Sequence, residues 1–190
     1  MTDSSRELRA DCARCCGLCC VGPAFDSAQG FAYDKPAHRP CRHLDDTNRC
    51  SIHAAREAHG FIGCAGFDCF GAGQWVTRQL LGGGSWRERS ADPTAVFDAF
   101  HRFRLLHEML AAIELARIRL AGDPDGLTVL MRRVEDACRE EERAAGSVPL
   151  SALRAEVFAG LRAQVPQNVC STHSSSAGGS SKPAPSGRSS

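Results

Sequence analysis

The sequence predicts a mainly α-helical protein, in which an irregular cysteine-rich N-terminal module packs on a small helical bundle followed by a disordered tail. Three observations predict this fold class. Nine of the 11 cysteines lie between Cys12 and Cys69, in a segment rich in Gly and Pro. From about residue 74, apolar residues recur at three- to four-residue spacing, which is typical of packed helices. The chain ends in a run of Ser, Gly and Pro, a composition that cannot build a core.

These shifts in composition divide the 190 residues into four parts. We expect a flexible N-terminus at 1–10, the cysteine module at 11–73, the helical bundle at 74–165 and the disordered tail at 166–190. The cysteine module has few periodic apolar residues, and a segment of this kind cannot fold on side-chain packing alone. We therefore expect a cross-link, a metal above all, to organise it.

The helical zone is expected to contain four helices, of which two or three run antiparallel with short connections as a small bundle. They are expected from Gln74 to Leu81, from Pro93 to Gly122, from Pro124 to Gly146 and from Ser151 to Gln164. Asp-Pro pairs open the second and third helices, with Asp as cap and Pro at the first helical position. The predicted core residues of the last three helices are Val96, Phe100, Phe103, Leu106, Leu110, Ile113, Leu120, Leu127, Leu130, Met131, Val134, Cys138, Leu153, Val157, Phe158 and Leu161. Trp75 and Trp86 are interpreted as anchors of this zone, and Cys170 as an unpaired thiol in the tail.

Charge and hydropathy exclude two classes of partner from the expected functions. The 23 basic and 22 acidic side chains nearly cancel, which is unlike the basic surface of a nucleic-acid-binding protein. The apolar runs are too short to cross a bilayer. Residues 1–10 lack the basic start and apolar stretch of a signal peptide. We therefore expect a cytoplasmic protein that binds neither nucleic acid nor membrane.

The cysteine spacing predicts a metal centre. In a reducing compartment, clustered cysteines favour metal ligation, whereas in a secreted protein the same density would indicate disulfides. The opening run Cys-Ala-Arg-Cys-Cys-Gly-Leu-Cys-Cys begins at Cys12. A Cys-x-x-Cys step brings two thiolates to one ion across a tight turn, for which Gly17 supplies the backbone freedom. Cys41 and Cys50 flank a turn-forming stretch that brings them together as a hairpin would.

The adjacent pair Cys19 and Cys20 leaves several metal arrangements open. Neighbouring side chains diverge, so both can hardly serve one tetrahedral ion. Either one is a spare thiol, or the two serve different metals or one polynuclear cluster. Thiolates suit zinc and iron–sulfur centres alike, and the surplus of sulfurs favours an iron–sulfur cluster over zinc. His53 has ligand-like spacing from Cys50, but a solvent-facing position on a short helix capped by Ser51 is the favoured interpretation.

The motifs CARCCGLCCVGPAF, FAYDKP, PCRHLDDTNRCSIH and GFIGCAGFDCFGAGQ occur in this order between Cys12 and Gln74. This third of the chain resembles the zinc- or iron-chelating cysteine-cluster domain of bacteria, in particular the N-terminal region of actinobacterial pentapeptide-repeat proteins. The resemblance implies metal ligands at Cys12, Cys15, Cys19, Cys20, Cys41, Cys50, Cys64 and Cys69. It does not require Cys16. The chain lacks the A-(D/N)-L-x-x repeats themselves, so a pentapeptide solenoid and its proposed DNA mimicry do not carry over.

The hypothesis that follows is a metal-binding protein, holding an iron–sulfur cluster or zinc, with a structural or redox-sensing role. The alternatives are an iron–sulfur redox or group-transfer enzyme, and a zinc-stabilised module whose helical bundle contacts a protein partner. The sequence contains no recognisable nucleophile–base pair and no paired carboxylates beside a pocket. A role other than catalysis is therefore favoured.

Overall fold

The computed structural model describes residues 7–119 and 124–164. Its helices are α1 (Ile62–Ala65), α2 (Ala72–Leu81), α3 (Pro93–Arg119), α4 (Pro124–Arg143) and α5 (Leu150–Ala163). The described residues form no strand, only two isolated antiparallel bridges. The predicted mainly α fold class is confirmed. Several expectations lie outside the described residues. They concern the N-terminus up to residue 6, Leu120, the helix signals at 122 and 123, and the tail with Cys170.

The four predicted helices are present within two or three residues of their expected ends. Helix α3 begins where predicted, because Asp92 accepts hydrogen bonds from the backbone N–H of Thr94 and Ala95, at 3.0 and 3.4 Å. Helix α2 begins two residues early, at Ala72, after Gly71 with φ +78°. Helix α4 ends at Arg143, before Gly146 with φ +84°. The start and stop signals read from the sequence therefore act much as expected.

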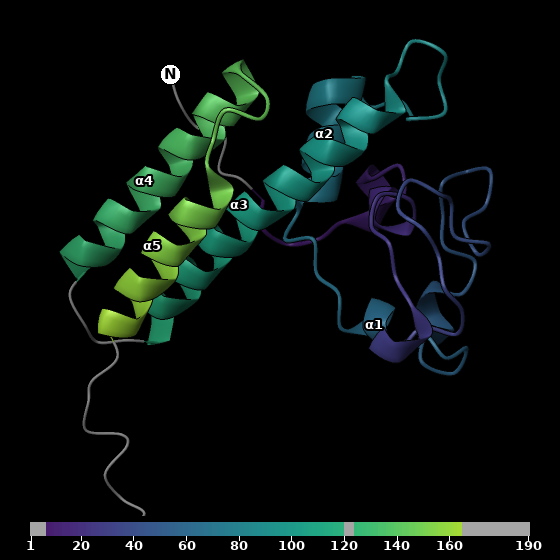
Figure 1. Cartoon of the computed structure of the whole chain (residues 1–190), viewed down its shortest axis with the longest axis horizontal. Coiled ribbons are helices and arrows are strands. Elements are labelled where there is room, and N and C mark those ends of the chain that lie inside the picture. Colours follow the sequence, from purple (N-terminus) through teal and green to yellow (C-terminus); the bar gives the residue numbers. More distant parts are fainter. Residues whose placement is uncertain (1–6, 120–123, 165–190) are drawn as a thin grey trace, which may run out of the picture.

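Helices α3, α4 and α5 pack side by side as a bundle, and α3 also contacts α2 (Figure 1). Most of the predicted apolar stripe is fully buried, with Leu106, Ile113, Val134 and Val157 at 0% exposure. Cys138 is also buried, so its predicted place in the core is confirmed. Leu130, Met131, Phe158 and Leu161 are partly buried at the edge of the same core. Among the described residues, no helix combines the length and the apolar character needed to cross a membrane.

An ion pair inside the bundle ties three of its segments together. The Glu141 side chain on α4 is 1% exposed and accepts two hydrogen bonds from Arg102 on α3, at 2.5 and 2.7 Å. It also accepts the backbone N–H of Gly146 at 2.7 Å, and Arg102 donates to the carbonyl of Val148. Burial acts to raise the pKa of Glu141, but these hydrogen bonds outweigh it and the pKa is lowered.

We expect Glu141→Gln to destabilise the bundle by about 2 kcal/mol at neutral pH, because the charged hydrogen bonds between the buried carboxylate and the partly exposed Arg102 guanidinium are lost. A lowered carboxyl pKa stabilises the fold above the ordinary glutamic acid range, and the effect disappears as pH falls through and below it. The difference between wild type and variant should therefore shrink in acid. Urea unfolding at several pH values measures this, with the exposed neighbour change Glu140→Gln as control. An unchanged difference at low pH would contradict the assignment.

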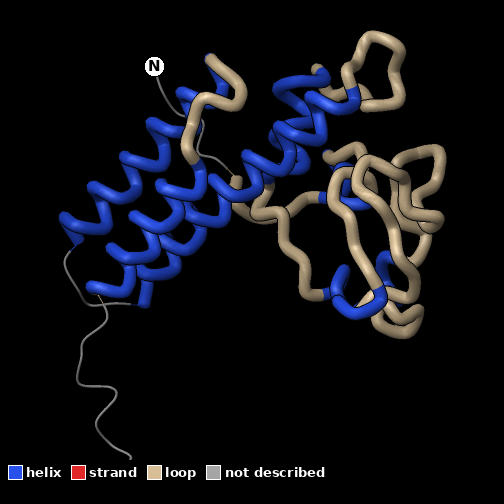
Figure 2. The backbone as a smooth tube through the Cα atoms, in the orientation of Figure 1, coloured by secondary structure: helices blue, strands red, loops and turns tan. Residues whose placement is uncertain are grey.

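The N-terminal module consists mostly of loops and short 3₁₀ turns (Figure 2). It surrounds a small aromatic cluster of its own, in which Phe25 stacks on Phe31 at 4.4 Å and Tyr33 lies edge-on to Phe61 at 5.8 Å. This cluster was not anticipated, because its members are scattered without helical or strand periodicity. The module therefore has some apolar packing in addition to its cysteines.

Helix α2 connects the module to the bundle, lying between them in Figure 1. Its Gln74 amide accepts from the backbone of Asp11 at 3.0 Å and donates to the carbonyl of Arg9 at 2.8 Å. Trp75 packs on Phe103 of α3 with ring centroids 3.9 Å apart. The predicted role of the two tryptophans as anchors is confirmed, since Trp86 packs on Phe97 and donates to a backbone carbonyl of the module.

Candidate metal centre

All eight predicted ligands lie in the module, and six of them divide between two apolar clusters by what they pack against. None of the ten cysteines in the described residues forms a disulfide. Three of the thiols pack against the main core, namely Cys15, Cys19 and Cys69. Three others belong to the aromatic cluster, namely Cys20, Cys41 and Cys64. Cys12 is exposed and Cys50 is partly buried.

The turn after Cys15 is built to hold a thiolate. Gly17 has φ +76°, and a Cβ there would lie 2.7 Å from Leu44, so glycine is required on both conformational and steric grounds. In this turn the backbone N–H groups of Leu18 and Gly17 donate to the Cys15 sulfur. Burial nevertheless raises the pKa of Cys15 to about 12, against these hydrogen bonds. The free thiol is therefore protonated, whereas the same N–H donors stabilise a metal-bound thiolate.

The turn after Cys69 repeats this arrangement at the start of α2. Burial raises the pKa of Cys69, while the N–H groups of Gly73 and Gly71 donate to its sulfur and lower it. Gly71 again has a left-handed backbone, at φ +78°. Gly73 leaves room for sulfur: a Cβ there would lie 2.7 Å from the Cys15 sulfur and 3.7 Å from the Cys69 sulfur. The first turn of α2 is thus a cradle for two thiols that are far apart in the sequence.

We expect Gly73→Ala to destabilise the module by about 2 kcal/mol and to weaken its metal binding, because the added methyl group displaces the Cys15 sulfur. In an open helical position the same change would stabilise the protein by about 1 kcal/mol. A loss of stability in Gly73→Ala, in place of the usual gain, would therefore indicate that the sulfur atoms occupy this space. Denaturant unfolding together with zinc titration measures it, and a gain in stability would show that the sulfurs do not need this space.

Cys41 and Cys50 are joined by a hairpin-like turn, as their spacing predicted. Leu44 and Cys50 form an antiparallel bridge. Asp45 organises the turn, because its carboxylate accepts the backbone N–H of Thr47 at 2.9 Å and of Arg49 at 2.8 Å. The Cys41 and Cys50 thiols lie close enough to interact electrostatically.

Tyr33, the chain's single tyrosine, donates a hydrogen bond from its hydroxyl to the Cys41 sulfur at 3.2 Å. Burial, and then this hydrogen bond, raise the pKa of Tyr33 to about 12. The hydroxyl therefore remains a donor across the physiological range. Hydrogen bonds to a thiolate ligand stabilise its negative charge, so Tyr33 is suited to support a ligand at Cys41.

Lys35 is a buried cation beside the thiols of the aromatic cluster. It is only 4% exposed, and four backbone carbonyl oxygens lie 2.6 to 3.1 Å from its ammonium, whose three N–H groups they share. These are the carbonyls of Val21, Pro23, Pro36 and Arg39. The ammonium also lies 5.0 Å from the centre of the Phe25 ring. Burial lowers the pKa of Lys35, and negative charge on Cys41, Cys20 and Cys64 raises it.

Two arginines add positive charge and order around the thiols. Arg49 donates to the backbone carbonyls of Cys12, Ala13 and Cys15, the last two at 2.7 and 3.0 Å, and so holds the first Cys-x-x-Cys turn. Arg56 donates to the carbonyl of Cys64 at 3.1 Å and lies close enough to lower the pKa of several thiols electrostatically. No motif or spacing in the sequence pointed to a role for Tyr33, Lys35 or these arginines. The only available signal was that Lys35 is one of two lysines among 23 basic residues.

His53 is exposed, as expected, but it does not lie on a helix capped by Ser51. The short 3₁₀ turn begins at His53 itself, with Ile52 before it. Ser51 instead donates its hydroxyl to the carbonyl of His43 at 3.1 Å, because the hairpin next to it uses this residue. His53 also contacts the Cys12 thiol, with Nε2 3.8 Å from the sulfur.

Cys16 packs in the contact between the module and α2. Its backbone N–H donates to the Thr77 hydroxyl at 3.2 Å, and its sulfur lies 3.4 Å from the same oxygen. Cys16 is 5% exposed and belongs to the main core. The expectation that Cys16 is not required as a ligand stays a prediction.

The donor set fits a thiolate metal site in its chemistry, in its backbone N–H donors and in the space at Gly73. Zinc and iron–sulfur centres both take thiolate ligands. As the side chains stand, however, no group of three or more His, Cys, Asp or Glu among residues 7–119 and 124–164 is arranged so that it could hold a metal ion.

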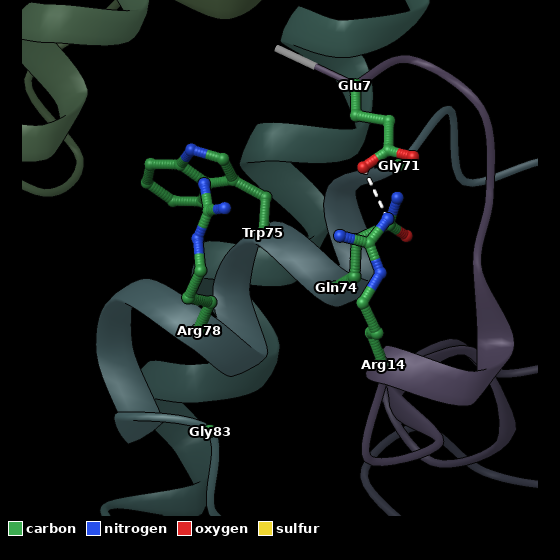
Figure 3. A pocket seen from close by; sticks show the side chains of 7 residues that line it. All are labelled: Glu7, Arg14, Gly71, Gln74, Trp75, Arg78 and Gly83. Carbon is green, nitrogen blue, oxygen red and sulfur yellow. Dashed lines mark hydrogen bonds and ion pairs between the residues drawn. The ribbon is translucent and has the colours of Figure 1, made fainter. Parts of the chain in front are cut away.

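A surface pocket lies on the other side of the Gly71 turn (Figure 3). Its lining residues are Glu7, Arg14, Gly71, Gln74, Trp75, Arg78 and Gly83. Glu7 and Arg14 form an ion pair along one wall. The lining contains no cysteine, so this pocket is separate from the thiol groups.

The chain is similar in sequence to two bacterial proteins. It is 42% identical over 104 residues to the uncharacterized protein YybG of Bacillus subtilis (strain 168), a match that covers 55% of this chain and 37% of YybG. It is 42% identical over 43 residues to the UPF0153 protein YeiW of Escherichia coli (strain K12), covering 22% of this chain and 51% of YeiW. The matched region thus spans about a third to a half of these relatives' own lengths.

No family model and no solved structure matches the chain. The two relatives show no connection to pentapeptide-repeat proteins, so that part of the expected resemblance stays a prediction. What the comparisons and the fold show together is a mainly α, cysteine-rich protein similar to YybG and, over a shorter stretch, to the UPF0153 protein YeiW.

Proposed function

We propose that this chain is a metal-binding protein whose N-terminal module holds an iron–sulfur cluster or zinc through cysteine thiolates. The observation that carries the proposal is the pair of turns after Cys15 and Cys69. Both turns aim backbone N–H groups at sulfur, and Gly73 leaves space for both sulfur atoms. Buried thiols gain nothing from such donors while protonated, whereas bound thiolates do.

The charges around the thiols support the same proposal. Several thiolates in one small module would repel each other strongly without a cation. Lys35, Arg49 and Arg56 supply positive charge at this place, and a bound metal supplies the rest. We propose a structural or redox-sensing role for the site, in a reducing compartment where the thiols stay available as ligands.

Metal analysis of the full chain, purified without oxygen, tests the proposal. Iron with acid-labile sulfide and a coloured protein would identify an iron–sulfur centre and direct attention to redox sensing. A colourless protein with stoichiometric zinc would identify a structural site. A folded chain without metal, in which alkylating reagents modify all of the module's thiols at once, would overturn the proposal.

A further inference from the structure

We propose that a second pocket, between the cysteine module and helix α3, binds a small aromatic carboxylate. This inference goes beyond the proposed function, because none of the residues that line the pocket is a cysteine. The pocket has a volume of about 330 Å³, which lies at the small end of the range for small-molecule sites. Its lining comes from three segments of the module and from α3.

One wall of the pocket is a single face of α3. Phe97, Phe100, His101 and Arg104 line it at positions i, i+3, i+4 and i+7, so they lie on the same side of the helix. Phe97 and Phe100 are almost fully buried, whereas His101 is exposed. This face therefore combines an apolar base with polar groups near the solvent.

The other wall consists of two loops of the module that Lys35 holds together. Pro23 and Ala24 belong to the first loop, and Ala37 and His38 belong to the second. The carbonyls that share the Lys35 ammonium come from residues 21 and 23 in the first loop and from residues 36 and 39 in the second. The wall is thus fixed before any ligand arrives, which lowers the entropic cost of binding.

His38 has a backbone conformation that histidine seldom adopts. Its φ of +60° lies in the left-handed region. Its N–H donates to the Gly22 carbonyl at 3.1 Å, and its ring packs on Phe97 with centroids 5.2 Å apart. Strained residues of this kind cluster at ligand-binding sites. The strain at His38 holds an imidazole beside the aromatic part of the lining.

Arg104 is the charged group that the fold leaves without a hydrogen-bond acceptor. Its side chain is 24% exposed, and its ion pair with Glu108 spans 4.0 Å, too long for a hydrogen bond. Glu108 instead accepts from Arg154 at 3.3 Å. Within the described part of the chain, the Arg104 guanidinium forms no hydrogen bond, and it lies 5.7 Å from the centre of the Phe67 ring. Its N–H groups are suited to the two oxygens of a carboxylate.

The lining selects the chemistry of the ligand. Phe67, Phe97 and Phe100 favour an aromatic ring, which packs well against other rings. Asp98 is the one acidic residue among the described residues of the lining, and it is exposed. Water screens an exposed carboxylate more than the mostly buried Arg104, so the pocket favours an anion over a cation.

Isothermal titration calorimetry of the folded full chain tests the pocket with three probes of similar size: phenylacetate, phenylacetamide and phenethylamine. We expect phenylacetate to bind, phenylacetamide to bind at least about tenfold more weakly because it lacks the charge, and phenethylamine not to bind. Equal binding of the acid and the amide would overturn the role of Arg104. Tighter binding of the amine, or no binding of phenylacetate, would overturn the proposal as a whole.

Two variants locate the bound probe. Arg104→Gln should weaken phenylacetate binding about tenfold or more and remove the preference over phenylacetamide. Arg117→Gln, which changes an exposed arginine of α3 outside the lining, is the matched control and should bind as wild type does. Ala37→Phe fills the pocket from the module wall without changing a charge, and it should abolish binding of both probes. Wild-type affinity in Ala37→Phe would show that phenylacetate binds elsewhere, even if the Arg104 variant failed to fold.

Discussion

Removing the bound metal with a chelator should unfold the module at residues 11–70 and leave helices α3, α4 and α5 folded. In small cysteine modules the free energy of metal binding is largely folding free energy, and zinc sites of this kind contribute on the order of 10 kcal/mol. The aromatic cluster around Phe25 and Phe61 is the module's own apolar packing. Without metal it has to offset the conformational entropy of about 60 residues, at 1–2 kcal/mol each, which it is too small to do.

The bundle does not depend on the metal in the same way. Its core is formed by long helices whose apolar residues are fully buried, and the ion pair of Glu141 and Arg102 adds a polar contact inside it. Helix α2 is the intermediate case, because it contacts both the Cys12–Arg14 turn and α3. We expect its first turn, at Gly73, to loosen with the module while Trp75 stays packed on Phe103.

Hydrogen exchange followed by mass spectrometry measures this outcome segment by segment. Protection should disappear in the module after chelation and persist in α3 and α4, and it should return when zinc is added back. Cys138→Ser, which changes a buried thiol of the bundle, is a control that should leave the metal content unchanged. Equal loss of protection in both parts would show that the whole chain folds as one metal-dependent unit. Full protection without metal would show that packing alone holds the module.

The helical half of the fold could be predicted because its signals are local. Asp92 and Pro93 start α3 through a cap that depends on three consecutive residues, and the buried stripe follows from the helical period. The candidate ligands could be named for a similar reason, since Cys-x-x-Cys spacing and clustering are visible in the sequence. Cys138 was placed in the core by its position on the stripe alone.

The interior of the module could not be predicted, because its contacts join residues far apart without periodicity. Cys15 and Cys69 meet at Gly73 only through the position of α2. The sorting of Cys19 and Cys20 between two apolar environments depends on the 3₁₀ turn that ends at Cys20, for which no sequence pattern was available. Ser51 was expected to cap a helix because of its propensity, but in the structure its hydroxyl donates a hydrogen bond to the His43 carbonyl of the hairpin. Tertiary contacts decided each of these cases.

Lys35→Met should destabilise the metal-loaded module by about 4 kcal/mol. Four backbone carbonyls, from residues 21–23 and 36–39, share the three N–H groups of the Lys35 ammonium, and a buried acceptor without a partner costs about 1–3 kcal/mol. An arginine could not replace it, because the compact ammonium lies at the centre of the four oxygens and a planar guanidinium has a different donor geometry. This explains a lysine at this position in a chain whose other basic residues are almost all arginine.

The same variant should also weaken metal binding, since the Lys35 ammonium lies near Cys20, Cys41 and Cys64 and its positive charge offsets the negative charge of metal-bound sulfur. Arg42→Met is the matched control: Arg42 is an exposed cation lying 4.2 Å from the Tyr33 ring, in the same part of the module. Its loss should cost no more than about 1 kcal/mol. Urea unfolding of the zinc-loaded proteins, followed through exchange in the module, compares the two variants. If both had equally small effects, Lys35 would be an ordinary surface cation. A large loss confined to Lys35→Met would instead establish that a buried ammonium, as well as the metal, organises the loops that carry Cys20, Cys41 and Cys64.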